Sequence, residues 1–278
     1  MKVCVTGASG KVGRATVTDL RAHGHEVLAI DRVPVLDPSA PTEMGVDLRD
    51  AGQTLEALRG CDAVVHMANI PAPGHHPPAV TFNDNMAMNF NVFHAAATLG
   101  CQRVVWASSE TTLGLPFDVP PRYAPVDEAH YPYPTSTYAL SKVASETIAE
   151  QIAAWAAIPF VALRFSNVFL PADYARVPGF WSDAGLRKWN LWGYVDVRDA
   201  AQACRRALEL DITGTERFII AAADTVMRTP SRALLEEVFP GVALTREIGE
   251  HETLLSIDHA REHLGYEPLH SWRTELEA

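Results

Sequence analysis

The residues best suited to chemistry are a tyrosine and a lysine in the stretch STYALSK. Tyr138 and Lys142 are four positions apart, so they share one face of the helix predicted there. A tyrosine hydroxyl titrates near pH ~10, and a neighbouring ammonium favours the phenolate and lowers that pKa. Taken alone, a pair at this spacing is typical of an ordinary helix surface, so its use as a base needs support from other residues.

Two serines supply part of that support. Ser108 and Ser109 end the apolar, strand-like run RVVWASS. A serine hydroxyl at the end of a neighbouring strand can hydrogen-bond the same substrate oxygen that a tyrosine base deprotonates. The serines and the tyrosine–lysine pair together indicate proton transfer at a hydroxyl group.

A glycine-rich turn near the start of the chain indicates the other reactant. The stretch CVTGASGKVGRAT places Gly7, Gly10 and Gly13 between a β-rich run, Lys2–Thr6, and apolar residues at helical spacing over Val12–Leu20. Glycines let backbone N–H groups approach an anion, and the positive end of the helix dipole lies at the same point. Such turns also occur where nothing binds, but this strand–turn–helix order favours the pyrophosphate of a dinucleotide.

An acidic residue follows about twenty positions after the turn. The run His25–Ile30 leads into Asp31, whose carboxylate can accept hydrogen bonds from the ribose hydroxyls of NAD. Asp31 would repel the 2′-phosphate of NADP, whereas Arg32 could accept it, so NADP stays open as an alternative. In such a site Lys142 would hold the nicotinamide ribose, and the positively charged ring would also favour a Tyr138 phenolate.

Composition excludes several other classes of protein. The 278 residues, 47% of them hydrophobic, suffice for one large α/β domain or one domain with a small appendage. The net charge of −11 disfavours a phosphate-tracking surface and so excludes nucleic acid as a partner. Without an apolar run near the roughly 18 residues of a membrane span, and without a leader segment, we expect a cytoplasmic protein and no membrane partner. Four scattered cysteines predict buried thiols.

Strand-like and helix-like segments alternate, which is typical of a parallel sheet covered by helices on both faces. The predicted strands are Lys2–Thr6, Glu26–Ile30, Ala63–His66, Arg103–Ala107, Phe160–Arg164 and Arg217–Ile220. The predicted helices after the first are Leu55–Arg59, Phe82–Leu99, Tyr138–Ala157, Asp199–Leu210 and Ser231–Val238. Proline-rich stretches at Pro71–Pro78 and Pro116–Pro134 are predicted loops, which in an open parallel sheet lie where ligands bind.

These motifs resemble those of the extended short-chain dehydrogenase/reductase family, in its NAD-dependent epimerase/dehydratase group, over nearly the whole chain. The matching segments are TGASGKVG, VDLRD, HMAN, NDNMAMN, ASSETTLG, YALSK, RFSNVFLP, YVDVRDAAQA and HLGYEP. One departure lies in HMAN, where Asn69 stands at a position at which alanine is commoner. The resemblance implies an NAD-dependent oxidoreductase with a Rossmann fold: a doubly wound parallel sheet with a small C-terminal substrate-binding lobe.

The resemblance also implies roles for individual residues. The catalytic residues would be Ser109, Tyr138 and Lys142, with Tyr138 as the acid/base and Ser108 as the less favoured serine. The cofactor-binding residues would be Gly7, Ser9, Gly10, Lys11, Val12, Gly13, Asp31, Arg32, Asp47 (to adenine), Leu48, Met67, Ala68, Asn69, Asn85, Ala107, Ser108, Tyr138 and Lys142. The substrate-binding residues would be Ser109, Thr111, Tyr138, Asn167 and Arg187. Residues 1–166 would form the NAD(P)-binding domain, with 190–222 returning to it, and 167–189 with 223–278 would form the lobe.

A short interval in the chain bears on the substrate. Between Asn167 and Tyr194 the chain lacks the longer insertion that holds the nucleotide in sugar-nucleotide epimerases and dehydratases, and in length and truncation it is most similar to the uronate dehydrogenases of the family. We therefore expect a small-molecule substrate: a free sugar, sugar acid or similar hydroxy compound. The alternatives are a sugar-nucleotide epimerase or dehydratase that retains its NAD, and a dinucleotide-sensing protein without catalysis. A homodimer is suggested only by analogy with the family.

Two histidine pairs each allow two interpretations. His75 and His76 either contact the substrate or are exposed in a proline-rich loop. His259 and His263 could form half of a metal site, but because no third ligand lies near them in the sequence, no metal is expected.

The segment before Tyr194 is also ambiguous. Its aromatic residues either stack on a sugar or close the core of the lobe; they are Trp181, Trp189, Trp192 and Tyr194 itself. Arg187 and Lys188 either pair with a substrate carboxylate or form a solvated basic pair.

Overall fold

The structure, a computed structural model, describes residues 1–33 and 43–276. Its centre is a seven-stranded sheet in which all paired strands are parallel, in the order β10–β7–β5–β4–β1–β2–β3. The strands are β1 (Lys2–Thr6), β2 (Glu26–Asp31), β3 (Glu43–Gly45), β4 (Ala63–His66), β5 (Arg103–Ala107), β7 (Phe160–Phe165) and β10 (Thr215–Ile220). The order runs outward in both directions from β1 and β4, so the predicted doubly wound fold is confirmed.

The strands form where the sequence has short runs of apolar, largely β-branched residues. All four residues of β4, AVVH, are buried, and so are all six of β7. Because helices cover both faces of the sheet, these runs do not alternate between apolar and polar residues. β3 is only three residues long and has no such run, which is why the sequence did not predict it.

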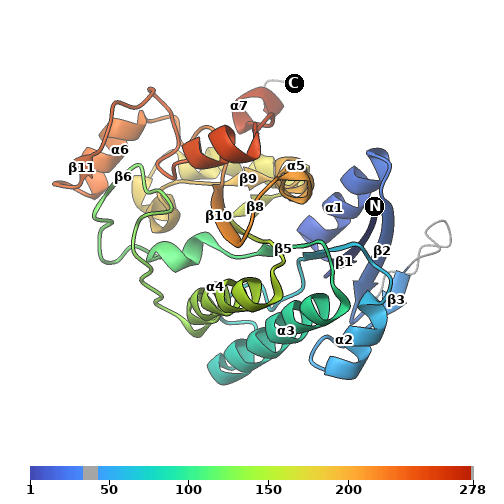
Figure 1. The fold of residues 1–278 in the computed structure, drawn as a ribbon. Coiled ribbons are helices and arrows are strands. Elements are labelled where there is room, and N and C mark those ends of the chain that lie inside the picture. Colours follow the sequence, from blue (N-terminus) through green and yellow to red (C-terminus); the bar gives the residue numbers. More distant parts are fainter. Residues whose placement is uncertain (34–42, 277–278) are drawn as a thin grey trace.

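Helices cover the two faces in separate groups, as Figure 1 shows. The helices are α1 (Lys11–Ala22), α2 (Ala51–Leu58), α3 (Pro78–Leu99), α4 (Thr137–Ala156), α5 (Val197–Glu209), α6 (Ser231–Val238) and α7 (Trp272–Glu275). α2, α3 and α4 share one hydrophobic core with the sheet, and α1 and α5 share the other. α3 begins at Pro78, one position inside a predicted loop, because the first turn of a helix tolerates a proline that lacks an N–H.

α4 carries the predicted base and is fixed at its start by a side-chain cap. The hydroxyl oxygen of Ser136 accepts a hydrogen bond from the backbone N–H of Ala139 at 3.1 Å. The side of α4 that faces the protein buries polar and charged groups, among them Tyr138, Lys142 and Glu146. A helix that buries such groups needs partners for them, which lie on the neighbouring strands and on α3.

The C-terminal part of the chain packs onto the α1/α5 face of the sheet and continues its core. Two small parallel sheets join β8 (Val168–Phe169) to β9 (Val195–Asp196) and β6 (Tyr123–Ala124) to β11 (Ala243–Leu244). β6 thus lies within the predicted loop Pro116–Pro134, where a two-residue edge strand is compatible with flanking prolines. Short helices follow at η2 (Pro171–Phe180) and η3 (Ala184–Asn190).

Further predictions concern the cysteines and the lobe aromatics. The four cysteines are free and buried, as expected. Trp192 and Tyr194 are fully buried in the core that continues from the sheet, so these two close the core rather than forming a sugar-binding surface. Across the two described stretches, no helix has the length and apolar character needed to cross a membrane.

Candidate active site

The glycine turn after β1 has backbone packing that only glycine allows at two positions. A Cβ on Gly13 would lie 2.1 Å from the carbonyl oxygen of Gly7. A Cβ on Gly7, whose φ is +65°, would lie 2.6 Å from the backbone nitrogen of Ala68. No described side chain caps α1, whose N-cap is the exposed Gly10. The first turn of α1 therefore has no capping side chain among the described residues, which fits binding of the pyrophosphate of a dinucleotide by backbone N–H groups.

Asp31 connects this turn to the end of β2. Its carboxylate accepts hydrogen bonds from the backbone N–H of Ser9 at 3.0 Å and of Val33 at 3.2 Å. Each carboxylate oxygen can accept more than one hydrogen bond, so both retain capacity for ribose hydroxyls. Arg32 is exposed beside it, and Lys11 at the start of α1 pairs with Asp173 of η2 at 3.3 Å.

The predicted adenine contact, Asp47, is held by an arginine. Arg49 Nη2 lies 2.6 Å from Asp47 Oδ2, and Arg49 Nη1 lies 3.1 Å from Asp84 Oδ2. Hydrogen bonds from Arg49 lower the pKa of Asp47 to about 2. Asp47 is therefore ionised at neutral pH and presents a carboxylate next to the buried Leu48.

Two predicted cofactor residues have side chains that bind the protein itself. The amide of Asn85 accepts from the backbone N–H of Ile70 at 2.8 Å and donates to the Ile70 carbonyl at 3.2 Å, which fixes the loop after β4. The Ser108 hydroxyl donates to Glu146 Oε1 at 2.7 Å. Met67 and Ala68 line the same loop, where their backbone packs against Gly7.

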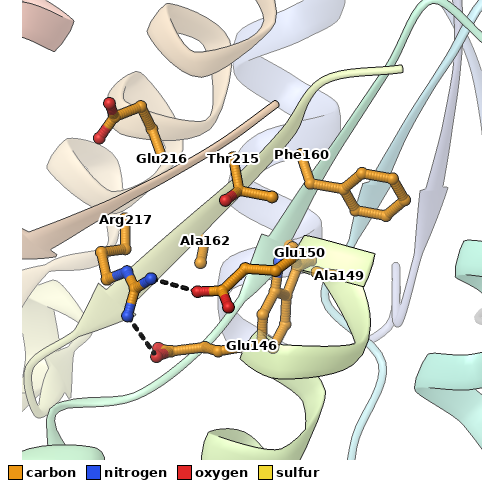
Figure 2. A pocket seen from close by; sticks show the side chains of 9 residues that line it. Glu146, Ala149, Glu150, Phe160, Ala162, Thr215, Glu216 and Arg217 are labelled. Atoms are coloured by element: carbon orange, nitrogen blue, oxygen red, sulfur yellow. Dashed lines mark hydrogen bonds and ion pairs between the residues drawn. The ribbon is translucent and has the colours of Figure 1, made fainter. Parts of the chain in front are cut away.

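Glu146 attaches α4 to three strands of the sheet. Arg164 of β7 donates to both of its carboxylate oxygens, at 2.9 and 2.8 Å, and Ser108 follows β5. Arg217 of β10 also approaches Glu146, at 3.7 Å, and pairs with Glu150 (Figure 2). The pocket drawn there is lined by Trp106, Glu146, Ala149, Glu150, Phe160, Ala162, Thr215, Glu216 and Arg217. Its volume of about 10 Å³ has room for one water and not for a substrate.

The three predicted catalytic residues lie together where β5 ends against α4. The Ser109 side chain acts on the Tyr138 hydroxyl in the direction that lowers its pKa. The Ser109 oxygen also accepts from the backbone N–H of Thr111 at 3.1 Å and from the Thr111 hydroxyl at 3.0 Å. Lys142 Nζ donates to the carbonyl of Ala107 at 2.6 Å and lies 5.6 Å from the centre of the Tyr138 ring. The side chains of all three predicted catalytic residues are buried.

Burial dominates the ionisation of this group. It raises the pKa of Tyr138 to about 12 and lowers the pKa of Lys142 to about 7. The sequence predicted a lowered tyrosine pKa from Lys142 and a charged nicotinamide ring together. Lys142 alone does not produce it, because its ammonium is directed to acceptors other than the tyrosine hydroxyl.

Glu110, directly after Ser109, was not predicted. Its carboxylate accepts from the Ser166 hydroxyl at 2.6 Å and from the side-chain amide of Asn190 at 3.3 Å. Burial raises its pKa to about 7. The sequence showed a carboxyl group beside the predicted serine, but its partners are 56 and 80 positions away, and no local pattern connects them.

Arg187 is buried and is not part of a solvated pair. It donates to Asn167 Oδ1 at 3.1 Å and to the carbonyl of Gly193 at 2.9 Å, and it lies 4.8 Å from the Trp189 ring centre. Its buried Nε has no partner among the described residues. Burial lowers its pKa to about 10, so the guanidinium stays charged at neutral pH.

The two histidine pairs contact none of the predicted catalytic residues through an interaction that the described residues show. His75 and His76 are exposed. The rings of His259 and His263 contact each other with centroids 4.6 Å apart, and His259 pairs with Glu216 at 3.3 Å. Within residues 1–33 and 43–276 no three histidine, cysteine, aspartate or glutamate side chains are grouped as metal ligands.

The doubly wound sheet and the glycine turn after β1 are the features of a dinucleotide-binding α/β protein. The model of the NAD dependent epimerase/dehydratase family matches residues 3–221, so the chain belongs to this family. It is an NAD-dependent enzyme, and NAD is its cofactor.

Relatives of this chain carry out more than one reaction. A UDP-glucose 4-epimerase of Lacticaseibacillus casei is 29% identical over 312 residues, covering 96% of this chain and 92% of that protein. An L-arabinose 1-dehydrogenase (NAD(P)(+)) of Haloferax volcanii is 28% identical over 220 residues, covering 76% of this chain and 84% of that protein. Among solved structures, a short-chain dehydrogenase/reductase superfamily protein from Agrobacterium tumefaciens with bound NAD has a TM-score of 0.78 at 22% identity, covering 100% of this chain and 95% of that chain, which shows the shared fold.

Proposed function

We propose that the protein is a dehydrogenase that oxidises a hydroxyl group of a free sugar, sugar acid or similarly small compound. The observation that carries this proposal is the buried contact of Ser109, Tyr138 and Lys142 at the end of β5. An exposed tyrosine–lysine pair would have favoured an ordinary helix surface. The buried set instead argues against a dinucleotide-sensing protein without catalysis.

In the proposed reaction, the Tyr138 phenolate takes the proton of the substrate hydroxyl as the C–H bond of the same carbon breaks. Bound NAD would supply the acceptor for the hydride of that C–H bond, so that the substrate would be left as a carbonyl product and the cofactor as NADH. Ser109 hydrogen-bonds the reacting oxygen. Lys142 would hold the nicotinamide ribose, and its charge together with that of the nicotinamide ring would favour the phenolate, which burial alone disfavours.

We assign the remaining predicted residues by region. Residues 1–166 with 190–222 would bind the cofactor, and 167–189 with 223–278 would bind the substrate, with Thr111 and Asn167 beside the reacting group. Asp31 favours NAD, and exposed Arg32 keeps NADP as the alternative cofactor. A sugar nucleotide needs cations for its diphosphate, but Arg187 is already bonded to Asn167 and Gly193, and Arg176 pairs with Asp173.

A sugar-nucleotide epimerase is the second candidate, and the epimerase of L. casei, aligned over 96% of this chain, supports it. In that reaction the hydride returns to the substrate and NAD stays bound. The deciding experiment measures NADH production, and binding, across aldoses, uronic acids and UDP-sugars. NADH released with a small sugar supports the dehydrogenase. Micromolar binding of a UDP-sugar, with no response to any small sugar, would reject it in favour of the epimerase.

We also propose a homodimer through α3 and α4. Their outer sides expose apolar residues, including Phe90, Leu140 and Trp155, the last with 69% of its surface accessible. α3 and α4 are neighbouring helices, and exposed apolar side chains on two such helices are compatible with an interface. Light scattering on the purified protein tests this: a monomer at micromolar concentration would contradict it.

A further inference from the structure

Lys142 is held by a side-chain amide of the loop that follows β4. Its Nζ donates to Asn69 Oδ1 at 2.5 Å and to the Ala107 carbonyl at 2.6 Å, and the lysine is 2% exposed. An ammonium has three N–H donors, so two of the three are directed away from the tyrosine. An alanine at position 69 would remove the Asn69 acceptor and leave the Ala107 carbonyl as the acceptor of the Lys142 ammonium.

Asn69 is itself fixed by a buried asparagine on α3. Its Nδ2 donates to Asn89 Oδ1 at 2.7 Å and to the carbonyl of Ala68. Asn89 Oδ1 also accepts from His66 Nε2 at 2.9 Å, and Asn89 Nδ2 donates to the Ser145 hydroxyl at 2.8 Å. Asn69 therefore cannot rotate its amide without breaking contacts to two other elements.

The donor and the acceptor of each hydrogen bond around His66 can be assigned from the groups that can only donate or only accept. Asn89 Oδ1 can only accept, so His66 Nε2 carries the ring proton and, in a neutral ring, Nδ1 accepts from the Thr6 hydroxyl at 2.7 Å. The Thr6 oxygen in turn accepts from the Ala68 N–H at 3.2 Å. Burial lowers the pKa of His66 to about 3, so the ring is neutral, with its proton on Nε2 facing Asn89. Thr6 is the last residue of β1, directly before Gly7. The network thus runs from the glycine turn to Lys142.

We propose that Asn69 is a positioning residue that fixes the ammonium of Lys142 through its Oδ1 and connects it, by way of Asn89 and His66, to the glycine turn. This inference deepens the proposed function, because it concerns the lysine to which that function assigns the ribose and the phenolate. A purely structural role is the competing explanation: Asn69 would then only attach its loop to Asn89 through Nδ2.

Two substitutions separate these roles. Asn69→Asp keeps the oxygen that accepts from Lys142 but loses the Nδ2 donor, whereas Asn69→Ala loses both. If the loop attachment is all that matters, the two variants should behave alike. If the acceptor matters, they should differ in the charge of Lys142. The other ionisable groups close to Lys142 are Tyr138 and Glu146 on its own helix and His66 on β4, and none is altered.

The chain allows a direct measurement, because it contains only four lysines: Lys2, Lys11, Lys142 and Lys188. Lysine labelled with ¹³C at Cε gives few NMR signals, and the spectrum of Lys142→Met assigns the one that matters. The titration of that signal is followed in the purified protein without substrate, so a failure of the proposed reaction in the NADH assay leaves this result separate.

We expect the midpoint of Lys142 to fall by about one pH unit in Asn69→Ala and to rise by about one to three units in Asn69→Asp, where a carboxylate faces the ammonium. The matched control is Gln202→Ala, which removes an amide that binds the backbone of Glu267 through two hydrogen bonds of 3.0 Å, and should leave the midpoint unchanged. Equal midpoints in both Asn69 variants, or no shift in Asn69→Asp, would overturn the proposal. If Asn69→Ala does not fold, an unshifted midpoint in Asn69→Asp still overturns the proposal.

Discussion

Glu110 and Glu146 are two buried glutamates near the predicted catalytic residues, and their carboxyl groups meet different partners. The charge of Glu110 acts on Tyr138, and that of Glu146 acts on Lys142. Glu146 receives two hydrogen bonds from the Arg164 guanidinium. Glu110 receives its hydrogen bonds from neutral groups, and a guanidinium, that of Arg187, acts on it only at longer range.

The difference shows how burial changes the pKa of a carboxyl group that a cation contacts directly and of one that no cation contacts directly. Burial acts to raise the pKa of both carboxyl groups, but the hydrogen bonds and charge of Arg164 outweigh it at Glu146, whose pKa is lowered. At Glu110 burial prevails and the pKa rises to about 7. Glu146 is thus a constant negative charge behind α4, whereas the charge of Glu110 changes near neutral pH.

The largest expected effect concerns Tyr138, on which the charge of Glu110 acts. Tyr138→Phe removes the transferable proton and should lower turnover by about 10³-fold or more, while the affinity for NAD stays within a few-fold. Stopped-flow measurement of NADH formation gives the turnover, and calorimetry with NAD gives the affinity for the cofactor. Turnover close to that of the unaltered protein would rule out Tyr138 as the base.

The next largest effect concerns stability and tests the constant negative charge of Glu146. Glu146→Ala leaves the buried Arg164 without its partner, so the free energy of unfolding should fall by about 3–5 kcal/mol. Glu150→Ala on the same helix is the control, since its half-exposed pair with Arg217 should contribute less than about 1 kcal/mol. Urea unfolding measures both. Similar losses in the two variants would mean that the buried pair is not what fixes α4.

The changing charge of Glu110 should appear as a pH dependence of stability. Its folded pKa is above the ordinary value of 4.5, so its contribution is fully present below about pH 4.5 and is lost as the pH rises through about 7. Between pH 5 and pH 8 the unaltered protein should lose up to about 3 kcal/mol relative to Glu110→Gln, which keeps a neutral side chain.

Urea unfolding at the two pH values measures this, with Glu236→Gln at an exposed position of α6 as the control. The pH dependence should persist in Glu236→Gln. Identical pH dependence in Glu110→Gln and the unaltered protein would show that Glu110 does not titrate in this range.

The smallest expected effect concerns a third carboxylate, that of Asp31. It accepts hydrogen bonds from backbone N–H groups and from neither a guanidinium nor a side-chain amide among the described residues. We expect the unaltered protein to use NAD with about tenfold higher kcat/KM than NADP, because Asp31 repels the 2′-phosphate. Asp31→Asn removes the charge and should narrow that ratio severalfold. Equal efficiency with both cofactors before the substitution would show that Asp31 is not the selector.

Much of the fold was predictable because its strands are local features. β1, β4 and β5 have the predicted bounds, since each is a short run of apolar residues between polar or glycine-containing segments. β8 and β9 were not predictable in the same way. Each has two residues, and the pairing of Val168 with Val195 depends on the packing of the intervening chain.

The candidate site likewise has features that the local sequence revealed and contacts that form only in the folded chain. The spacing of Tyr138 and Lys142 on one helix turn and the glycine turn are local, so the sequence revealed them. The contact between Asn69 and Lys142 joins positions 73 apart, and it forms only when β4 and α4 meet in the fold. Ser108 shows the reverse case: its motif was visible, but the acceptor for its hydroxyl, Glu146, was not.

The pair between Arg164 and Glu146 also has a consequence for ionic strength. Their side chains are 1% and 8% exposed, so dissolved ions do not screen their attraction, whereas Arg49, which binds Asp47 and Asp84, is 41% exposed. Added salt therefore weakens the attachments at the predicted adenine end of the site and leaves the attachment of α4 as it was. In a saline medium the side chains around the predicted adenine contact would therefore be held less firmly than α4, which carries the predicted nicotinamide contact.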